Sequence, residues 1–284
     1  MRQRFSKGVI AIISIVTVLA VAITVGIFTL LNRVTPFKET GEGCKITTPD
    51  GSLELEIGQA QVASIIAVVA ARRKLPERAV VIAYATGIQE SKLLNLSFGD
   101  RDSVGVFQQR PSQGWGTAKQ LIDPVYATEK FFAALVKVKN YRKLPVHEAA
   151  QKVQRSADGS AYAQHEDEGK ILAAAFTGRV PKAVHCWFPE PTTTATATGA
   201  TASATPLPST DRARRGLAHA LGANATFTTT SQRYGWLMAS WSVTHAKKFG
   251  LRKIRYSGQS WTSANGEEGW KPDSGAPTGK VEIS

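Results

Sequence analysis

One continuous stretch, residues 87–116, contains most of the side chains suited to chemistry, and it reads GIQESKLLNLSFGDRDSVGVFQQRPSQGWG. Glu90 and Ser91 end a segment whose apolar residues recur at helical spacing, so the Glu90 carboxyl is expected at a helix end. Beyond them the pattern breaks into Asn, Gly, Asp and Pro, which predicts a long loop. A long loop within a compact domain is usually a binding or active-site element. The sequence therefore points to acid–base chemistry by a carboxylic acid facing a loop.

The spacing within this stretch resembles that of the soluble lytic transglycosylases and goose-type lysozymes. Those proteins carry a Glu-Ser pair at a helix end, and the Gly of a Gly-x-x-Gln turn follows fifteen residues later. Here the matching residues are Glu90, Ser91, Gly105 and Gln108. Asp123-Pro124 and the helix expected after it extend the resemblance to residues 75–135. The resemblance implies a lysozyme-like fold of the soluble-lytic-transglycosylase type and cleavage of the β-1,4 glycan strands of peptidoglycan.

Cleavage of a glycosidic bond requires a carboxylic acid that protonates the leaving oxygen, and the resemblance assigns this role to Glu90. Without that context, a single Glu is most often a solvated surface charge. The resemblance also implies that Ser91 and Gln108 orient the acid and the sugar. Further candidates for substrate binding lie in the same loop, and for the aromatic ones the alternative is a place in the core. They are Phe98, Phe107, Gln109 and Trp115.

A second carboxylate would decide between hydrolysis and transglycosylation, because water needs activation whereas the muramyl 6-hydroxyl can attack within the same strand. Asp100 and Asp102 are the candidates. Asp in a Gly-Asp-Arg-Asp loop ordinarily stabilises turns through hydrogen bonds to its own backbone, so a structural role is the alternative.

The sequence departs from the family it resembles in one place. Transglycosylases of this type usually carry an Ala-Tyr-Asn-x-Gly segment that brings a Tyr to the acid, and no such segment is present. Residues 148–176 read EAAQKVQRSADGSAYAQHEDEGKILAAAF instead, with Gln154, Arg155 and Ser156 about where the segment would fall. Tyr162 is the candidate for the missing tyrosine.

Helical spacing predicts helices over residues 59–73, from Pro76 to Ser91, over 124–139 and over 147–176. Residues 8–31 carry no charge, are rich in Ile, Val, Ala and Leu, and are long enough to cross a membrane. Arg2, Arg4 and Lys7 precede them, so residues 1–7 are expected inside and the rest outside the cell. A cleaved signal peptide is the alternative. The predicted fold is a mostly α lysozyme-like domain at residues 44–188, after one transmembrane helix at 8–31.

Residues 189–210, rich in Thr, Ala and Pro, are predicted to form a linker because they contain almost no large apolar side chain. A small α+β domain of unknown role is expected at 211–284, with a helix from Ser231 and strands near 251–256, Trp261 and 281–283. Its tryptophans are expected mainly in the core. A second interpretation makes the first domain a non-catalytic glycan-binding scaffold, and a third makes the C-terminal domain a receptor for anionic wall polymer.

The two cysteines, Cys44 and Cys186, both lie on the side predicted to be outside, where thiols are oxidised, so we expect a disulfide. Two buried thiols are the alternative. His185 beside Cys186 lacks the spacing of a zinc site, and we predict neither metal nor cofactor. The net charge of +13 favours anionic polymers as partners. Because the predicted topology excludes nucleic acid, the expected partners are peptidoglycan strands, the membrane and anionic wall polymers.

Overall fold

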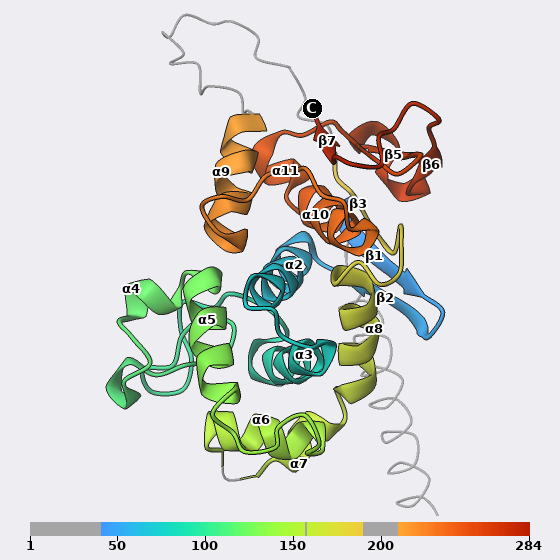
Figure 1. The fold of residues 1–284 in the computed structure, drawn as a ribbon. Helices are drawn as coiled ribbons and strands as arrows, with labels where there is room; N and C mark the ends of the chain where they lie inside the picture. The colour runs from blue at the N-terminus through green and yellow to red at the C-terminus, as the bar shows by residue number, and fades with distance from the viewer. Residues whose placement is uncertain (1–40, 157, 190–209) are drawn as a thin grey trace, which may run out of the picture. The chain divides into compact units, whose positions relative to one another are not determined.

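Two helices, α2 and α3, form the centre of the fold, which is known from a computed structural model that describes residues 41–156, 158–189 and 210–284 (Figure 1). α2 (Ile57–Arg72) is composed mainly of Ala, Val and Ile, and it packs against α3, α5, α9 and α10. α3 (Glu77–Ser91) packs against α6 and α8. Small apolar side chains allow this close approach on several sides, so both helices are buried over most of their lengths.

The remaining helices of the described part of the chain surround this pair or belong to the C-terminal region. They are α4 (Ala118–Leu121), α5 (Pro124–Leu135), α6 (Val146–Gln154), α7 (Ser160–Ala163), α8 (Glu166–Phe176), α9 (Thr210–Leu221), α10 (Gln232–Thr244) and α11 (Ala246–Phe249), with 3-10 turns η1 (Pro111–Gln113) and η2 (Ser263–Glu268).

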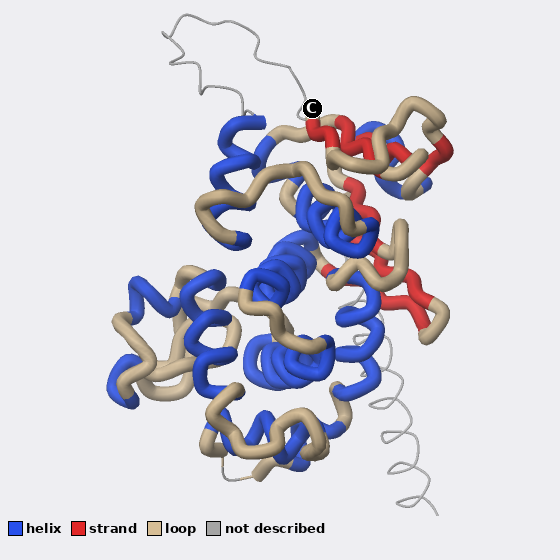
Figure 2. Tube along the Cα trace, viewed as in Figure 1, coloured by secondary structure: helices blue, strands red, loops and turns tan. Residues whose placement is uncertain are grey.

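The strands form two small antiparallel sheets (Figure 2). The first has the order β2-β1-β3, from β1 (Gly43–Thr48), β2 (Gly51–Leu55) and β3 (Val184–Trp187). The second has the order β6-β5-β4-β7, from β4 (Lys253–Tyr256), β5 (Gln259–Thr262), β6 (Lys271–Pro272) and β7 (Glu282–Ile283).

The predicted fold class is therefore wrong. About half of the described residues are helical, and a sheet within the first module accompanies its helices (Figure 2). The hairpin that the prediction missed has a local signal: residues 44–48 alternate buried and exposed side chains, and the two-residue turn Pro49-Asp50 joins β1 to β2. No helix within the described ranges is long and apolar enough to cross a membrane, and the anchor predicted at 8–31 lies outside those ranges.

The predicted disulfide between Cys44 and Cys186 is confirmed. The two residues are direct partners in the register of β1 and β3, so the bond joins neighbouring strands whose positions in the sequence are 142 residues apart. Both side chains are buried. The bond thus fixes β3, which follows α8, to the first strand of the described chain.

The C-terminal region packs onto this sheet and onto α2, and residues Gly41–Ser284 form one compact unit. The indole of Trp261 donates to the Cys186 carbonyl oxygen at 3.1 Å, and the indole of Trp270 donates to the Val184 carbonyl oxygen at 2.8 Å. The helix expected from Ser231 is α10, and Ser231 caps it by accepting from the Tyr234 backbone amide.

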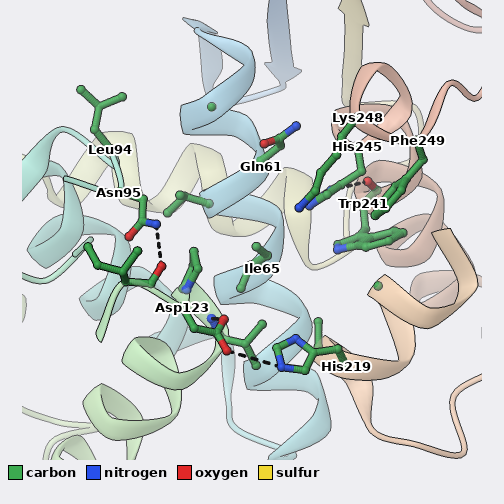
Figure 3. A pocket seen from close by; sticks show the side chains of 17 residues that line it. Gln61, Ile65, Leu94, Asn95, Asp123, His219, Trp241, His245, Lys248 and Phe249 are labelled. Atoms are coloured by element: carbon green, nitrogen blue, oxygen red, sulfur yellow. Dashed lines mark hydrogen bonds and ion pairs between the residues drawn. The ribbon is translucent and has the colours of Figure 1, made fainter. Parts of the chain in front are cut away.

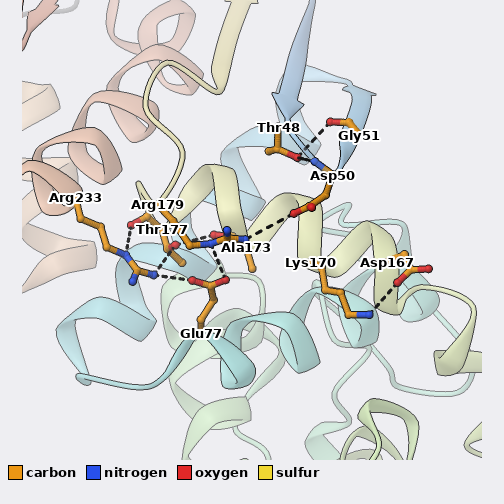
Figure 4. Close-up of polar contacts among 10 residues, drawn as sticks. All are labelled: Thr48, Asp50, Gly51, Glu77, Asp167, Lys170, Ala173, Thr177, Arg179 and Arg233. Atoms are coloured by element: carbon orange, nitrogen blue, oxygen red, sulfur yellow. Dashed lines mark hydrogen bonds and ion pairs between the residues drawn. The ribbon is translucent and has the colours of Figure 1, made fainter.

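A polar cluster also joins the two regions (Figure 4). Glu77, in the first turn of α3, accepts from Arg179 at 3.1 Å and from Arg233 of α10 at 2.8 Å. Arg233 also donates to the Thr177 hydroxyl, which lies directly after α8. The carboxylate of Glu77 therefore links α3 to α10 and to the segment after α8, and its place at a helix N-terminus is itself favourable for a negative charge.

Candidate active site

Glu90 lies in the last turn of α3, at the helix end where the apolar spacing predicted it, and its side chain is half-buried. The helix ends because Lys92 adopts the left-handed conformation, with φ of 54°, and Leu93 follows with φ of 60°. The Gln59 side chain of α2 donates to the Lys92 carbonyl oxygen at 2.8 Å, and Leu93 is buried beneath the turn. These contacts hold the end of α3 that carries Glu90.

Two side chains from a distant part of the sequence hold the Glu90 carboxyl. The Tyr162 hydroxyl donates to Oε1 at 2.7 Å, and Gln154 Nε2 donates to the same oxygen at 2.9 Å. Burial raises the pKa of the Tyr162 hydroxyl well above its usual value, and the hydrogen bond to Glu90 raises it further, so the phenol remains a donor. Among the residues that the structure describes, no group donates a hydrogen bond to Oε2, the other oxygen of the carboxyl.

The loop after α3 returns to this carboxyl through a tight turn. The backbones of Val104 and Gln109 pair at 3.1 Å in both directions, which makes residues 104–109 a small hairpin. Gly105 has φ of 78°, and a β-carbon there would lie 2.4 Å from the Leu121 carbonyl oxygen, so only glycine fits. Gln154 Nε2 also donates to the Phe107 carbonyl oxygen at 2.8 Å. One amide thereby joins the hairpin to Glu90.

Ser91 and Gln108, the residues expected to orient the acid and the sugar, have structural contacts in this hairpin. The Ser91 hydroxyl is buried and lies 2.7 Å from the Val106 carbonyl oxygen, to which it donates. Gln108 has φ of 45°, and its side-chain amide donates to the Gly105 carbonyl oxygen at 3.1 Å. The Ser91 hydrogen bond therefore joins the hairpin to the end of α3, and the Gln108 hydrogen bond stabilises the turn of the hairpin.

The other loop residues expected near substrate divide between core and surface. The Phe107 ring is completely buried and stacks on Phe131, with ring centroids 4.4 Å apart, so only its backbone faces Glu90. Gln109 is buried too and donates to the Ala127 carbonyl oxygen at 3.3 Å. Trp115 is partly buried against the core. Phe98, by contrast, is 71% exposed.

The two candidate second carboxylates also differ. Asp102 accepts from Arg110 Nε at 2.8 Å and from the Ser112 backbone amide at 2.7 Å. The hydrogen bond from Arg110, together with the one from Ser112, holds the pKa of Asp102 far below its usual range. Asp102 is thus an ionised group that organises the loop around η1. The Asp100 side chain is 92% exposed.

Comparison with known proteins concerns a different part of the chain. Residues 173–281 match the model of the family described as VldE, C-terminal domain. No match was found among curated proteins.

The matched segment begins inside α8, contains β3 to β6, and ends at Val281, the residue before β7. It contains Trp261 and Trp270 together with the β3 carbonyls to which they donate, so the similarity covers a set of residues that contact one another. Glu90, Gln154 and Tyr162 all precede it.

Proposed function

We propose that the chain cleaves the β-1,4 glycan strands of peptidoglycan with Glu90 as the single general acid and base. The observation that carries this proposal is the convergence of Tyr162 and Gln154 on Glu90 Oε1. The resemblance of Glu90, Ser91, Gly105 and Gln108 to the lytic transglycosylase pattern supplies the substrate class. The disulfide supports a location outside the reducing cytoplasm.

The arrangement of donors suits an acid that must give up and take back a proton. Because both donors reach Oε1, Oε2 is the oxygen that holds the proton in the neutral acid. The proton passes from Oε2 to the glycosidic oxygen as the bond between that oxygen and C1 breaks. The carboxylate formed then keeps two hydrogen bonds, which become stronger because their acceptor is now charged.

The second half of the reaction needs only the same carboxylate. Asp102 accepts hydrogen bonds from Arg110 and Ser112, and the Asp100 side chain is exposed to solvent. Because neither carboxylate contacts Glu90, these positions support a mechanism with one carboxyl group. The muramyl 6-hydroxyl attacks C1 and its proton returns to Glu90, giving a 1,6-anhydro product. In a non-catalytic scaffold, the same hydrogen bonds would only anchor the hairpin to α3.

Substitution of Glu90 separates these two functions. Purified full-length chain and its Glu90→Gln variant would be incubated with isolated cell wall, and the released fragments identified by mass spectrometry. Gln retains the acceptor oxygen toward Tyr162 but has no acidic proton, so release should fall by about 100- to 10,000-fold. Glu148→Gln, on α6, is the matched control and should release fragments at the parent rate.

The product identifies the mechanism. The parent and Asp102→Asn should both release fragments with 1,6-anhydromuramyl ends. If the parent instead releases fragments with reducing ends, and Asp102→Asn does not, Asp102 activates water. Equal release by parent and Glu90→Gln would refute the catalytic role. A parent chain that binds glycan strands but releases nothing above the blank would favour the scaffold.

A further inference from the structure

A cavity of about 440 Å³ lies beside α2, and its lining contains none of the residues that hydrogen-bond to Glu90 (Figure 3). Its walls come from α2, the loop after α3, the start of α5, and helices α9, α10 and α11 with their flanking residues. Its volume falls within the range of about 300–1,000 Å³ typical of small-molecule sites. The polar side chains in its lining are Gln61, Asn95, Asp123, His219, His245 and Lys248. Neither Glu90 nor Tyr162 is among its lining residues.

His245 supplies this cavity with a hydrogen-bond acceptor. Its side chain is 3% exposed, and its Nδ1 lies 2.9 Å from the Trp241 carbonyl oxygen. A carbonyl oxygen only accepts, so Nδ1 carries the proton and Nε2 has a lone pair. Burial lowers the pKa of the imidazole to about 3, which keeps it neutral. Nε2 has no hydrogen-bond partner in the described part of the chain.

The imidazole is also held in one orientation. Its ring stacks on Trp241 with centroids 4.3 Å apart and planes 18° apart, and Nδ1 lies 3.1 Å from the Thr244 hydroxyl. Nε2 is therefore a fixed acceptor on a residue that lines the cavity, and no described side chain or backbone group donates to it. A hydroxyl or amide N–H of a bound molecule would satisfy Nε2.

Lys248 supplies the cavity with a positive charge. Lys248 lies in α11, three residues after His245, and its side chain is exposed. No carboxylate of the described residues lies within ion-pair distance of it. Asp123, the one carboxylate in the lining, is already engaged: Oδ1 accepts from the Val125 amide at 3.0 Å, and Oδ2 lies 3.4 Å from His219. The ammonium of Lys248 lies 5.5 Å from the centre of the Phe249 ring and faces no described carboxylate, so its charge attracts an anion.

We propose that this cavity binds a small hydroxylated anion, whose hydroxyl donates to His245 Nε2 and whose negative group pairs with Lys248. Ile65 and Phe249 provide apolar surface for its carbon skeleton. Two sources share this chemistry, a sugar acid and a polyol phosphate. The proposal is independent of the proposed glycan cleavage, because none of the residues around Glu90 contributes to it.

Calorimetric titration of the full-length chain tests the site with three probes: N-acetylmuramic acid, glycerol 3-phosphate, and neutral N-acetylglucosamine. At least one anion should bind saturably and about tenfold more tightly than the neutral sugar, because only the anions carry a negative group that pairs with the Lys248 ammonium. The tighter of the two anions identifies the source. Lys248→Gln should weaken binding of that anion by about tenfold or more.

Matched variants separate this site from the rest of the chain. Lys137→Gln removes an exposed lysine that does not line the cavity and should bind like the parent, as should Glu90→Gln. His245→Asn retains a donor toward Trp241 and removes Nε2, so it should also weaken binding. If His245→Asn does not fold, the ¹⁵N resonance of Nε2 in labelled parent protein reports the hydrogen bond, since it should shift on saturation. Failure of both anions to bind, or equal affinity in parent and Lys248→Gln, would overturn the proposal.

Discussion

The hydrogen bond from Tyr162 to Glu90 joins residues 72 positions apart in the sequence and places a buried phenol on the proposed acid. Tyr162 is a positioning residue, because the atom that it contacts belongs to Glu90. Tyr162→Phe should lower kcat for glycan cleavage by about 10- to 100-fold, because a hydrogen bond to a charged acceptor contributes about 1.5–3 kcal/mol. KM should change little. Steady-state kinetics on soluble glycan fragments would measure both.

A matched control is available in Tyr141, whose hydroxyl is buried without a hydrogen-bond partner in the described structure. Tyr141→Phe removes a desolvated hydroxyl and should retain parent kcat, with equal or greater resistance to urea. An equal fall in kcat for both variants would indicate a general packing effect. An unchanged kcat in Tyr162→Phe would remove the phenol from the proposed mechanism.

At this residue scale the sequence predicted the position of Glu90 but only part of its surroundings. Glu90, Ser91 and Gly105 belong to one continuous stretch, and helical spacing and turn chemistry are local properties that a sequence displays. Gln154 and Tyr162 reach Glu90 through the packing of α6 and α7 against α3. Their only signal was their place near the segment in which the lytic transglycosylases that the sequence resembles carry a tyrosine. The burial of Phe107 likewise depends on α5, which supplies Phe131.

At the scale of elements, the first sheet is the feature that helical spacing did not predict. β1 and β2 are short, and β3 comes from the other side of α8, so only tertiary pairing completes the sheet. The cysteines gave the one sequence signal for this long-range contact, since two cysteines predicted to lie outside the cell are expected to form a disulfide. Trp261 and Trp270 then cover β3 by donating to its carbonyls. The disulfide therefore joins strand β3 to β1, and the indole hydrogen bonds join it to the C-terminal region.

The disulfide should contribute strongly to stability because it closes a long loop. Cys44→Ser with Cys186→Ser should lower the free energy of unfolding by about 2–5 kcal/mol, as expected for closure of a loop of this length. Urea titration of the double variant and of the parent, with and without reductant, measures the difference. The parent should lose stability on reduction and the double variant should not respond. Reductant-independent stability of the parent would contradict this role for the bond.

At the scale of the whole molecule, the family match and the proposed acid occupy different parts of one compact unit. The matched segment supplies α9 and α10, which pack on α2, and α11, which packs on α9 and α10, and together these helices complete the cavity around His245. Glu77 joins the same region to α3 through Arg179 and Arg233 (Figure 4). The C-terminal region thus contacts the N-terminal end of α3, whose other end carries Glu90, so its loss should affect both sites.

Buried His245, at the contact between the C-terminal region and α2, makes the stability of this unit depend on pH. Its folded pKa is about 3 whereas an unfolded histidine titrates near 6.5, so below about pH 6.5 the unfolded chain binds a proton that the folded chain excludes. The contribution of neutral His245 to the free energy of unfolding is therefore fully present above pH 6.5. It declines as pH falls toward 3, by at most about 1.4 kcal/mol per pH unit. Asp102 and Asp273, whose pKa values are lowered by Arg110 and Arg255, add a further decline below about pH 4.

Urea titrations of the parent and of His245→Asn between pH 7.5 and 4.5 isolate the histidine contribution from that of Asp102 and Asp273, whose lowered pKa values act only below about pH 4. The parent should lose stability steadily below pH 6.5, by up to roughly 3 kcal/mol at pH 4.5. The slope should be much smaller in the variant, even if the lost packing against Trp241 lowers its stability at every pH. Parallel slopes in the two proteins would mean that His245 is protonated in the folded state or that another group dominates. His185, whose pKa burial also lowers, would then be the next residue to replace.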